Sequence, residues 1–197
     1  MSAPLVVFGG TFDPPHIGHL LAAECARWQA GAREVRFIPA GDPYRKAARE
    51  VSPAEDRLAM TRLAILHNDA LTVDDREVLR RGPSYTADTL AEYHAEGEQN
   101  LVFVIGIDAL ADMPNWKLPA RIGELARLLV ALKGEDASAI APLARAAGLA
   151  RIPEPLDMPA LGISGTLIRG RVRAGKPIRY LVSPAVAGYI EEHGLYR

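Results

Sequence analysis

The sequence predicts an α/β fold in which helices cover both faces of a parallel sheet. Short apolar runs recur along the 197 residues, and a segment with a helical pattern follows each of them. Two runs, residues 101–105 and 128–132, are continuously apolar, which is typical of strands buried on both faces. Ligands of such sheets bind beyond the carboxyl ends of the strands. We therefore expect functional residues in the loops that follow strands.

The expected elements form a regular series. Ser52 is the expected N-cap of the second helix, because it precedes Pro53, a residue that a first helical turn tolerates. A small C-terminal helical part is expected at about residues 164–197 of a single domain, 1–197. Strands are predicted at residues 5–8, 34–38, 71–73, 101–105 and 128–132, and helices at 18–30, 53–66, 85–95, 137–150 and from about 165.

Composition excludes several classes of protein. The formal net charge is −1, from 23 basic and 24 acidic residues, so nothing global indicates binding to nucleic acid or to an anionic membrane. Cys25 is the single cysteine, which excludes an intramolecular disulfide and a cysteine-based zinc site. No apolar run reaches the roughly 18 to 20 residues that cross a bilayer. The start lacks the basic region of a signal peptide, so a cytoplasmic protein is expected.

The first loop, residues 9–19 (GGTFDPPHIGH), directly follows the first strand. Gly9 and Gly10 let the backbone approach a bulky anion without interference from Cβ atoms. His16 and His19, three positions apart at a helix start, can both face one point, where amide N–H groups and the helix dipole favour an anion. The alternative is a Gly/Pro turn with two structural histidines. Zinc is disfavoured because no cysteine or third histidine is nearby in sequence.

A second loop, residues 162–169 (GISGTLIR), has the same chemistry near the C-terminus. Ser164 is the expected N-cap of a helix from about Gly165, and Thr166 offers a second hydroxyl to an anion. Arg169, about one turn further on, can return its guanidinium to the same place and bind a phosphate through two hydrogen bonds. The alternative is an ordinary capped helix with a surface arginine.

Both loops resemble motifs of one family. Residues 10–19 resemble the signature of the nucleotidyltransferase superfamily, whose core is His-x-Gly-His, in the longer form of the bacterial nicotinate-nucleotide adenylyltransferases. Residues 163–169 resemble the Ile-Ser-x-Thr-x-Ile-Arg motif of that family, which grips the triphosphate of ATP. Gly165 stands where the family often has serine or alanine.

Three segments in the middle of the chain also resemble this family. Residues 84–90 (SYTADTL) resemble its motif associated with the pyridine nucleotide, and Thr86 at a helix start can present a hydroxyl and amides to a carboxylate. Asp108 is expected to end a buried strand, placed for a ribose hydroxyl or merely as a cap. Trp116 and Lys117 resemble its Trp-Lys/Arg pair, in which Trp116 stacks on the pyridine ring or, alternatively, lies in the core.

One loop departs from the pattern. Where the family commonly has Gly-x-Pro-Pro-His-Lys, residues 41–46 read GDPYRK, so Tyr44 and Arg45 replace proline and histidine. Lys46 still matches and could neutralise phosphate charge, or it forms a solvated pair with Arg45. Residues 57 and 60 match a helical Arg-x-x-Met pattern for which structural duty is expected.

The resemblance implies a Rossmann-like, doubly wound sheet and a reaction. The adenylyl group of ATP would pass to nicotinate mononucleotide, giving deamido-NAD and pyrophosphate in NAD biosynthesis, with Mg²⁺ carried mainly by the ATP phosphates. Catalytic roles are implied for His16, His19, Lys46 and Arg169. Binding of ATP is implied for Gly9, Gly10, Thr11, Phe12, His16, His19, Gly106, Asp108, Ile163, Ser164, Thr166 and Arg169, and binding of the pyridine nucleotide for Asp13, Lys46, Tyr85, Thr86, Trp116 and Lys117.

Three alternatives stay open from the sequence. The acceptor could be nicotinamide mononucleotide, or both pyridine nucleotides. A phosphopantetheine adenylyltransferase or a cytidylyltransferase would share the first loop but should lack residues 84–90 and Trp116 in these settings. A non-catalytic nucleotide-binding protein would not need His16, His19, Lys46 and Arg169 together. A homo-oligomer is also left open.

Overall fold

The computed structural model describes residues 3–43 and 51–197. Among these residues six strands form one sheet in the order β3-β2-β1-β4-β5-β6, which is the order of a Rossmann-like doubly wound fold. Strands β1, β4, β5 and β6 pair in parallel, with Leu5 opposite Leu101 and Val104 opposite Leu129. The predicted fold class is confirmed. The strands are β1 Leu5–Gly10, β2 Glu34–Pro39, β3 Leu71–Val73, β4 Leu101–Gly106, β5 Arg127–Ala131 and β6 Glu154–Pro155.

The chain divides into two compact units. Unit 1 comprises Met1–Gly9, Ala22–Arg36 and Tyr85–Leu161. Unit 2 comprises Gly10–Leu21, Phe37–Ser84 and Gly162–Arg197. Each unit is therefore assembled from three stretches of the sequence that alternate with those of the other unit.

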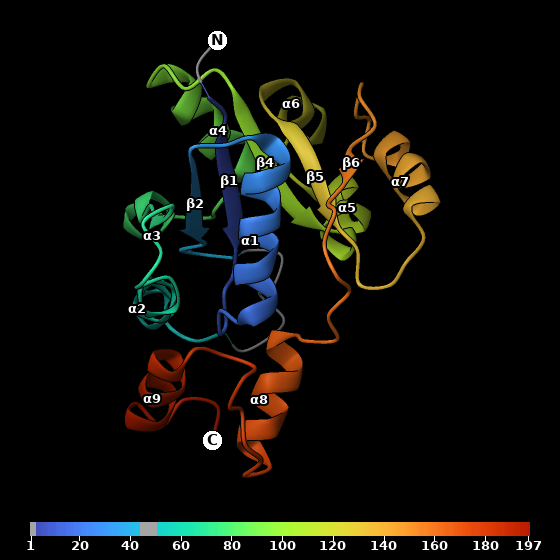
Figure 1. Cartoon of the computed structure of the whole chain (residues 1–197). Helices are drawn as coiled ribbons and strands as arrows, with labels where there is room; N and C mark the ends of the chain where they lie inside the picture. The colour runs from blue at the N-terminus through green and yellow to red at the C-terminus, as the bar shows by residue number, and fades with distance from the viewer. Residues whose placement is uncertain (1–2, 44–50) are drawn as a thin grey trace. The chain divides into compact units, whose positions relative to one another are not determined.

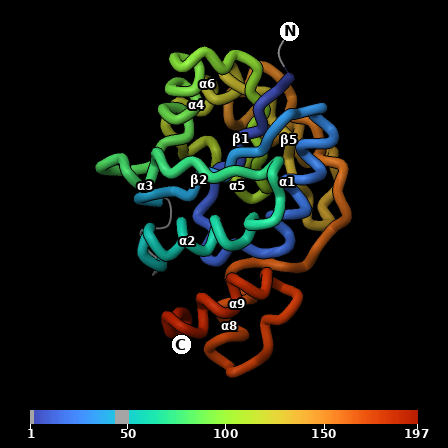
Figure 2. The backbone as a smooth tube through the Cα atoms, turned by 60° about the vertical axis from the view of Figure 1, so that its left-hand side comes forward, coloured from blue at the N-terminus to red at the C-terminus, as the bar shows by residue number. Residues whose placement is uncertain are grey.

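Unit 1 holds the buried strands. All residues of β4 except Gly106 are buried, as the continuous apolar run predicts. Helix α1, Ile17–Ala30, covers one face of these strands and the pair α4 and α6 covers the other (Figures 1 and 2). The remaining elements of this unit are α4 Thr86–Ala95, α5 Ile107–Asp112, η2 Met113–Asn115, α6 Pro119–Leu125, η3 Ala137–Ala139 and α7 Ile140–Ala146.

Unit 2 is mainly helical. Its helices are α2 Ala54–Ala64, α3 Arg76–Leu79, α8 Gly165–Arg173 and α9 Pro184–Glu192. Two of them begin with a serine N-cap: Ser164 accepts from the Leu167 N–H and Ser183 from the Val186 N–H. Their apolar faces form a core cluster of Met60, Ile168, Val182, Val186 and Ile190.

Some predicted boundaries were wrong. The N-cap of α2 is Pro53. The carbonyl oxygen of Ser52 instead accepts a hydrogen bond from the Arg57 Nε–H at 2.9 Å. The helix predicted at 137–150 is a short 3-10 turn followed by α7, and the chain leaves the helical conformation where Gly148 takes a φ of +71°. Asp108 does not end a strand, because β4 stops at Gly106 and α5 begins at Ile107.

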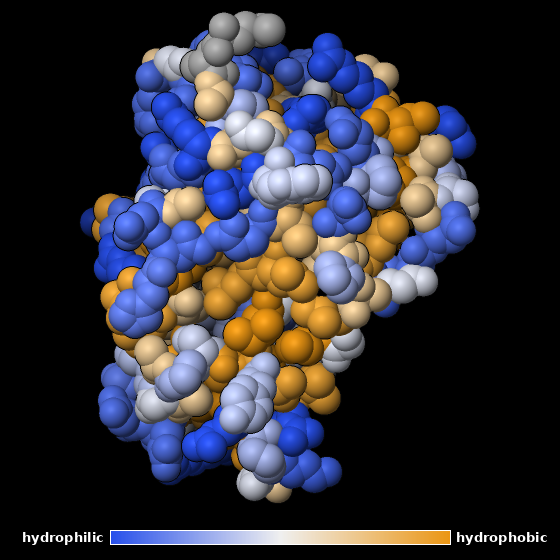
Figure 3. Space-filling model, in the orientation of Figure 1, coloured by the Kyte–Doolittle hydropathy of each residue, from blue (hydrophilic) through white to orange (hydrophobic). Residues whose placement is uncertain are grey.

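Hydrophilic residues cover most of the face shown in Figure 3, with hydrophobic residues exposed between them. Trp28 and Tyr180 are the most exposed large apolar side chains among the described residues, at 76% and 82%. No helix in the described ranges is long and apolar enough to cross a bilayer.

Candidate functional site

The loop between β1 and α1 is held in place by an aromatic side chain. Phe12 is 2% exposed and takes a φ of +49°, a left-handed conformation that is unfavourable for a residue with a Cβ atom. Its ring packs against Phe37 at 5.4 Å between centroids and meets His19 edge-on at 5.0 Å. These contacts overcome the backbone cost and fix the loop, which ends at His16 and leads into the first turn of α1 with His19.

His16 and His19 lie side by side, and residues 11–19, the loop with the first turn of α1, are called the histidine loop below. Their rings stack at 3.7 Å between centroids with an angle of 22°, and His16 is buried. The backbone N–H of His16 donates to Nδ1 of His19 at 3.2 Å. Because that Nδ1 accepts, the proton of a neutral His19 ring is on Nε2, the tautomer that donates from its outer nitrogen. The structure thus brings the two imidazoles together, while their contact with phosphate stays a prediction.

Helix α8 contributes a buried arginine to the same loop. Arg169 is only 6% exposed, so the alternative of a surface arginine is wrong. Its Nη1–H donates to the carbonyl oxygen of Asp13 at 2.6 Å, and Nη1 lies 3.8 Å from the Asp13 carboxylate. Its Nη2–H donates to the Thr166 hydroxyl at 3.2 Å. The guanidinium therefore joins the two sequence motifs.

Gly165 makes this contact sterically feasible. A Cβ atom at this position would lie 2.8 Å from the Asp13 carbonyl oxygen and 3.0 Å from Nη1 of Arg169. Real Cβ atoms essentially never approach a backbone atom so closely, so a larger residue here would force the first turn of α8 or the loop to shift. This gives a physical reason for glycine where the resembled motif often has serine or alanine.

Arg57 ties further backbone to the loop. It is 1% exposed and donates to the carbonyl oxygens of Thr11 at 2.9 Å and Gly41 at 3.0 Å, besides that of Ser52. Burial lowers the pKa of the Arg57 guanidinium, and the negative charge of Asp13 acts in the opposite direction. The structural duty expected for Arg57 is thus a set of hydrogen bonds to three backbone carbonyl groups of unit 2.

The residues predicted to bind a pyridine nucleotide do not form one group. Asp13 is buried in unit 2, whereas Tyr85, Thr86, Trp116 and Lys117 belong to unit 1. Thr86 is the first residue of α4. Lys117 donates to both carboxylate oxygens of Asp88, at 2.8 and 3.0 Å, and its Nζ lies 4.6 Å from the centre of the Tyr85 ring. The side chains of Lys117 and Asp88 are 42% and 39% exposed. Tyr85, Asp88 and Lys117 are called the lysine cluster below.

Trp116 is half-buried, so the alternative of a core tryptophan is wrong. Its Nε1–H donates to the Asp112 carboxylate at 3.1 Å, which fixes the indole orientation. Asp108 is exposed and pairs with Lys133. Sequence reasoning missed Asp112 and Lys133, although Lys133 comes two residues after a buried strand, the place where functional residues are expected.

The other predicted residues lie in different settings. Gly9 and Gly10 end β1, and Gly106 ends β4. Ile163 packs against the core cluster of unit 2, which is a structural role. Lys46, with Tyr44 and Arg45, lies outside the described residues.

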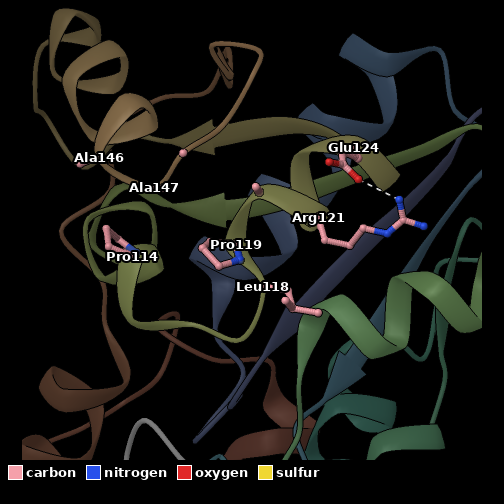
Figure 4. A pocket seen from close by; sticks show the side chains of 9 residues that line it. Pro114, Leu118, Pro119, Arg121, Glu124, Ala146 and Ala147 are labelled. Carbon is pink, nitrogen blue, oxygen red and sulfur yellow. Dashed lines mark hydrogen bonds and ion pairs between the residues drawn. The ribbon is translucent and has the colours of Figure 1, made fainter.

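A shallow groove of about 620 Å³ in unit 1 contains none of the predicted site residues (Figure 4). It is lined by Leu118, Pro119 and other residues of the α6 and α7 region, and Arg121 pairs with Glu124 at 2.8 Å beside it. Its lining is largely apolar and its one ion pair is satisfied internally, so it does not resemble a phosphate site.

Known proteins similar to this chain fall in one family. The Cytidylyltransferase-like family model matches residues 7–171. A protein of Roseiflexus sp. (strain RS-1) with the name "Probable nicotinate-nucleotide adenylyltransferase" is 45% identical over 199 residues, covering 100% of this chain and 99% of that protein. A protein of Desulfitobacterium hafniense (strain Y51) with the same name is 42% identical, covering 97% of this chain and 94% of that protein.

A solved structure has the same fold. Plasmodium falciparum nicotinic acid mononucleotide adenylyltransferase complexed with NaAD matches 99% of this chain and 98% of its own chain with a TM-score of 0.78. The sequence identity is 16%, so this likeness concerns the fold alone. The family model and the identities above 40% over nearly the full length together show that this chain belongs to the nicotinate-nucleotide adenylyltransferases, within the cytidylyltransferase-like family.

Proposed function

We propose that this protein transfers the adenylyl group of ATP to nicotinate mononucleotide, giving deamido-NAD and pyrophosphate in NAD biosynthesis. The observation that carries the proposal is the bond between the two phosphate-binding motifs, in which buried Arg169 holds the Asp13 carbonyl of the histidine loop. The family of the chain and the names of its relatives support the same reaction.

The chemical step is a direct displacement. A phosphate oxygen of the mononucleotide attacks the α-phosphorus of ATP, a new P–O–P bond forms, and the bond from that phosphorus to the β-phosphate oxygen breaks. Pyrophosphate leaves with the electron pair, and no group of the protein becomes covalently attached. Catalysis of this kind rests on positioning and on electrostatic stabilisation of the phosphoryl oxygens.

In this proposal the residues of unit 2 hold the polyphosphate. His16 and His19 donate hydrogen bonds to the α- and β-phosphates, and Arg169 and Lys46 offset the negative charge that spreads over the leaving group. Thr166 and the N-terminal amides of α8 bind the polyphosphate beside Ser164. The burial of His16 and Arg169 strengthens the interactions of these two residues, because little water competes with them.

Residues of unit 1 select the second substrate in this proposal. The hydroxyl of Thr86 and the N-terminal amides of α4 bind the carboxylate of the nicotinate ring, and the indole of Trp116 stacks on that ring. A site that donates hydrogen bonds to a carboxylate discriminates against the amide, because the donors would lose their acceptor.

Mg²⁺ would neutralise charge on the ATP phosphates and orient them for the displacement. In residues 3–43 and 51–197 no group of three His, Cys, Asp or Glu side chains could hold a metal ion. In this proposal the ion is bound mainly by phosphate oxygens and water, which is how Mg²⁺ often binds with nucleotides.

The test is release of pyrophosphate from Mg-ATP with nicotinate mononucleotide, nicotinamide mononucleotide and phosphopantetheine in parallel reactions. Turnover that is selective for nicotinate mononucleotide is expected. Equal turnover of the two pyridine nucleotides would contradict the role of Thr86 in recognising the acid. Turnover with phosphopantetheine alone, or with none of the three, would overturn the proposal.

A further inference from the structure

The chain turns back on itself after α9 and carries its last residues toward the histidine loop. Gly194 takes a φ of +62°, and its N–H donates to the Glu191 carbonyl at 3.2 Å. The Leu195 N–H donates to the Ile190 carbonyl at 3.0 Å. These two bonds form a Schellman motif, which ends a helix and reverses the chain through a left-handed glycine.

Tyr196 follows directly and is held in an unfavourable backbone conformation. Its φ is +65°, where a side chain with a Cβ atom is strained. Its ring packs against the core cluster of unit 2, and its hydroxyl donates to Oδ1 of Asp13 at 2.7 Å. Burial raises the pKa of the Tyr196 hydroxyl, so the hydroxyl keeps its proton and remains a donor at neutral pH. The contacts of the side chain therefore outweigh the backbone strain.

Asp13 is the point where this bond meets the proposed phosphate site. The residue is 5% exposed, and its carbonyl oxygen accepts from Arg169. The carboxylate and the carbonyl belong to one residue in the loop that carries His16 and His19. By holding the Asp13 carboxylate, the Tyr196 hydroxyl therefore restrains both the loop and the carbonyl oxygen to which Arg169 donates.

We propose that Tyr196 is a positioning residue for adenylyl transfer, whose hydroxyl holds the Asp13 carboxylate and thereby orients Arg169 and the histidine loop toward the phosphates of ATP. This role rests on the proposed function, since it concerns the same phosphate site. Tyr196 itself touches no reacting atom in this scheme.

The chain offers a matched control. Tyr189 on α9 donates to the Asp56 carboxylate on α2 at 2.7 Å, the same donor, acceptor and distance as the bond of Tyr196. Burial and the bond to Asp56 raise the pKa of Tyr189 to about 12. This bond joins α9 to α2 and involves neither the histidine loop nor Arg169. Tyr189→Phe therefore removes an equivalent hydrogen bond elsewhere in unit 2.

The experiment compares Tyr196→Phe with Tyr189→Phe by two measurements. In steady-state assays with Mg-ATP and nicotinate mononucleotide, Tyr196→Phe should lower kcat about tenfold. This is the effect expected when one hydrogen bond to the Asp13 carboxylate, which orients the phosphate site, is lost. The KM for ATP should change less than about threefold. Tyr189→Phe should leave kcat within about twofold of the wild type.

Hydrogen exchange gives a readout that does not depend on turnover. Tyr196→Phe should increase exchange in peptides covering residues 10–21, while Tyr189→Phe should leave those peptides unchanged. Combining Tyr196→Phe with Asp13→Ala should lower kcat no further than Asp13→Ala alone, because Asp13→Ala already removes the acceptor of the Tyr196 hydroxyl.

The outcomes separate this role from the proposed function. Unchanged exchange at residues 10–21 in Tyr196→Phe would overturn the positioning role even if the wild type is an active adenylyltransferase. An equal loss of kcat in both tyrosine variants would also overturn it, since that result indicates general destabilisation. A wild type without turnover would remove the proposed function, and exchange would still decide whether Tyr196 orders the loop.

Discussion

The histidine loop of unit 2 and the lysine cluster of unit 1 both carry charged side chains but differ in burial. Around the loop, Asp13, Arg57 and Arg169 are each at most 6% exposed. The two guanidinium groups donate to backbone carbonyl oxygens, among them that of Asp13. In the lysine cluster, Lys117 and Asp88 are about two-fifths exposed and pair mainly with each other. Buried polar networks fix one geometry, whereas exposed ion pairs are screened by water and rearrange easily.

Under the proposed function, the difference in burial suits the two regions to different work. Electrostatic catalysis requires donors that are already oriented when charge develops, which a buried network supplies. Recognition of an incoming nucleotide tolerates side chains that rearrange on binding. Substitutions around the loop should therefore change stability and kcat, while substitutions in the lysine cluster should change KM with little effect on stability.

The largest loss of stability is expected for Arg57→Leu. The change removes donors from three carbonyl groups, of which that of Thr11 is buried, so the free energy of unfolding should fall by about 3–5 kcal/mol, which urea denaturation measures. Arg62→Leu is the control on the same helix, because Arg62 is 56% exposed and pairs with Asp75. Its effect should stay below about 1 kcal/mol. Similar losses in the two variants would break the comparison.

His19→Ala should lower kcat about 10²–10³-fold with a much smaller change in the KM for ATP. The imidazole is proposed to bind phosphate oxygens more strongly as charge develops, and such interactions appear in kcat. Exposed His67 is the control, since His67→Ala should leave kcat unchanged. Near-normal turnover of His19→Ala would remove the assigned role.

Gly165→Ala tests how closely α8 approaches the loop. Relative to glycine, alanine stabilises a helix by about 1 kcal/mol. A Cβ atom 2.8 Å from the Asp13 carbonyl oxygen, however, forces a displacement that costs about 1–3 kcal/mol. The clash should win, so both thermal stability and kcat should fall. Gly170→Ala in the same helix meets nothing within 4 Å and should raise the melting temperature. A stabilising Gly165→Ala would contradict the observed approach.

The smallest effect is expected for Lys117→Met. The ion pair with Asp88 is exposed, so the free energy of unfolding should change by less than about 1 kcal/mol. Loss of the positive charge should raise the KM for nicotinate mononucleotide about three- to tenfold and leave kcat within about twofold. Arg121→Met, which removes another exposed ion pair of unit 1, should leave that KM unchanged. A loss of kcat as large as that of His19→Ala would show that the lysine cluster also serves catalysis.

The fold and the local positions of the motifs could be predicted from sequence because they depend on neighbouring residues. Apolar runs located β1, β4 and β5, and the N-cap Ser164 located the start of α8. The helix predicted at 137–150 was wrong in its bounds, because alanine content indicates a helix but not the position, near Gly148, at which it ends.

The bonds that hold the site could not be predicted in this way. Arg169 and Asp13 are 156 positions apart, and Tyr196 and Asp13 are 183 apart. Such pairs depend on tertiary packing, and a single sequence contains no pattern of spacing that links them. The burial of Arg169 likewise follows from the contact of α8 with the loop, since its own segment looks equally suited to a surface helix.

The most direct test of the division between the two regions compares two variants with both pyridine nucleotides. We would measure kcat and KM for nicotinate and nicotinamide mononucleotide in the wild type, His19→Ala and Thr86→Val. His19→Ala should lower kcat equally for both acceptors and keep their ratio of kcat/KM. Thr86→Val should keep kcat and reduce that ratio. If His19→Ala changes the ratio, or if Thr86→Val lowers kcat for both acceptors alike, the assignment of catalysis to the buried loop and of selectivity to unit 1 is wrong.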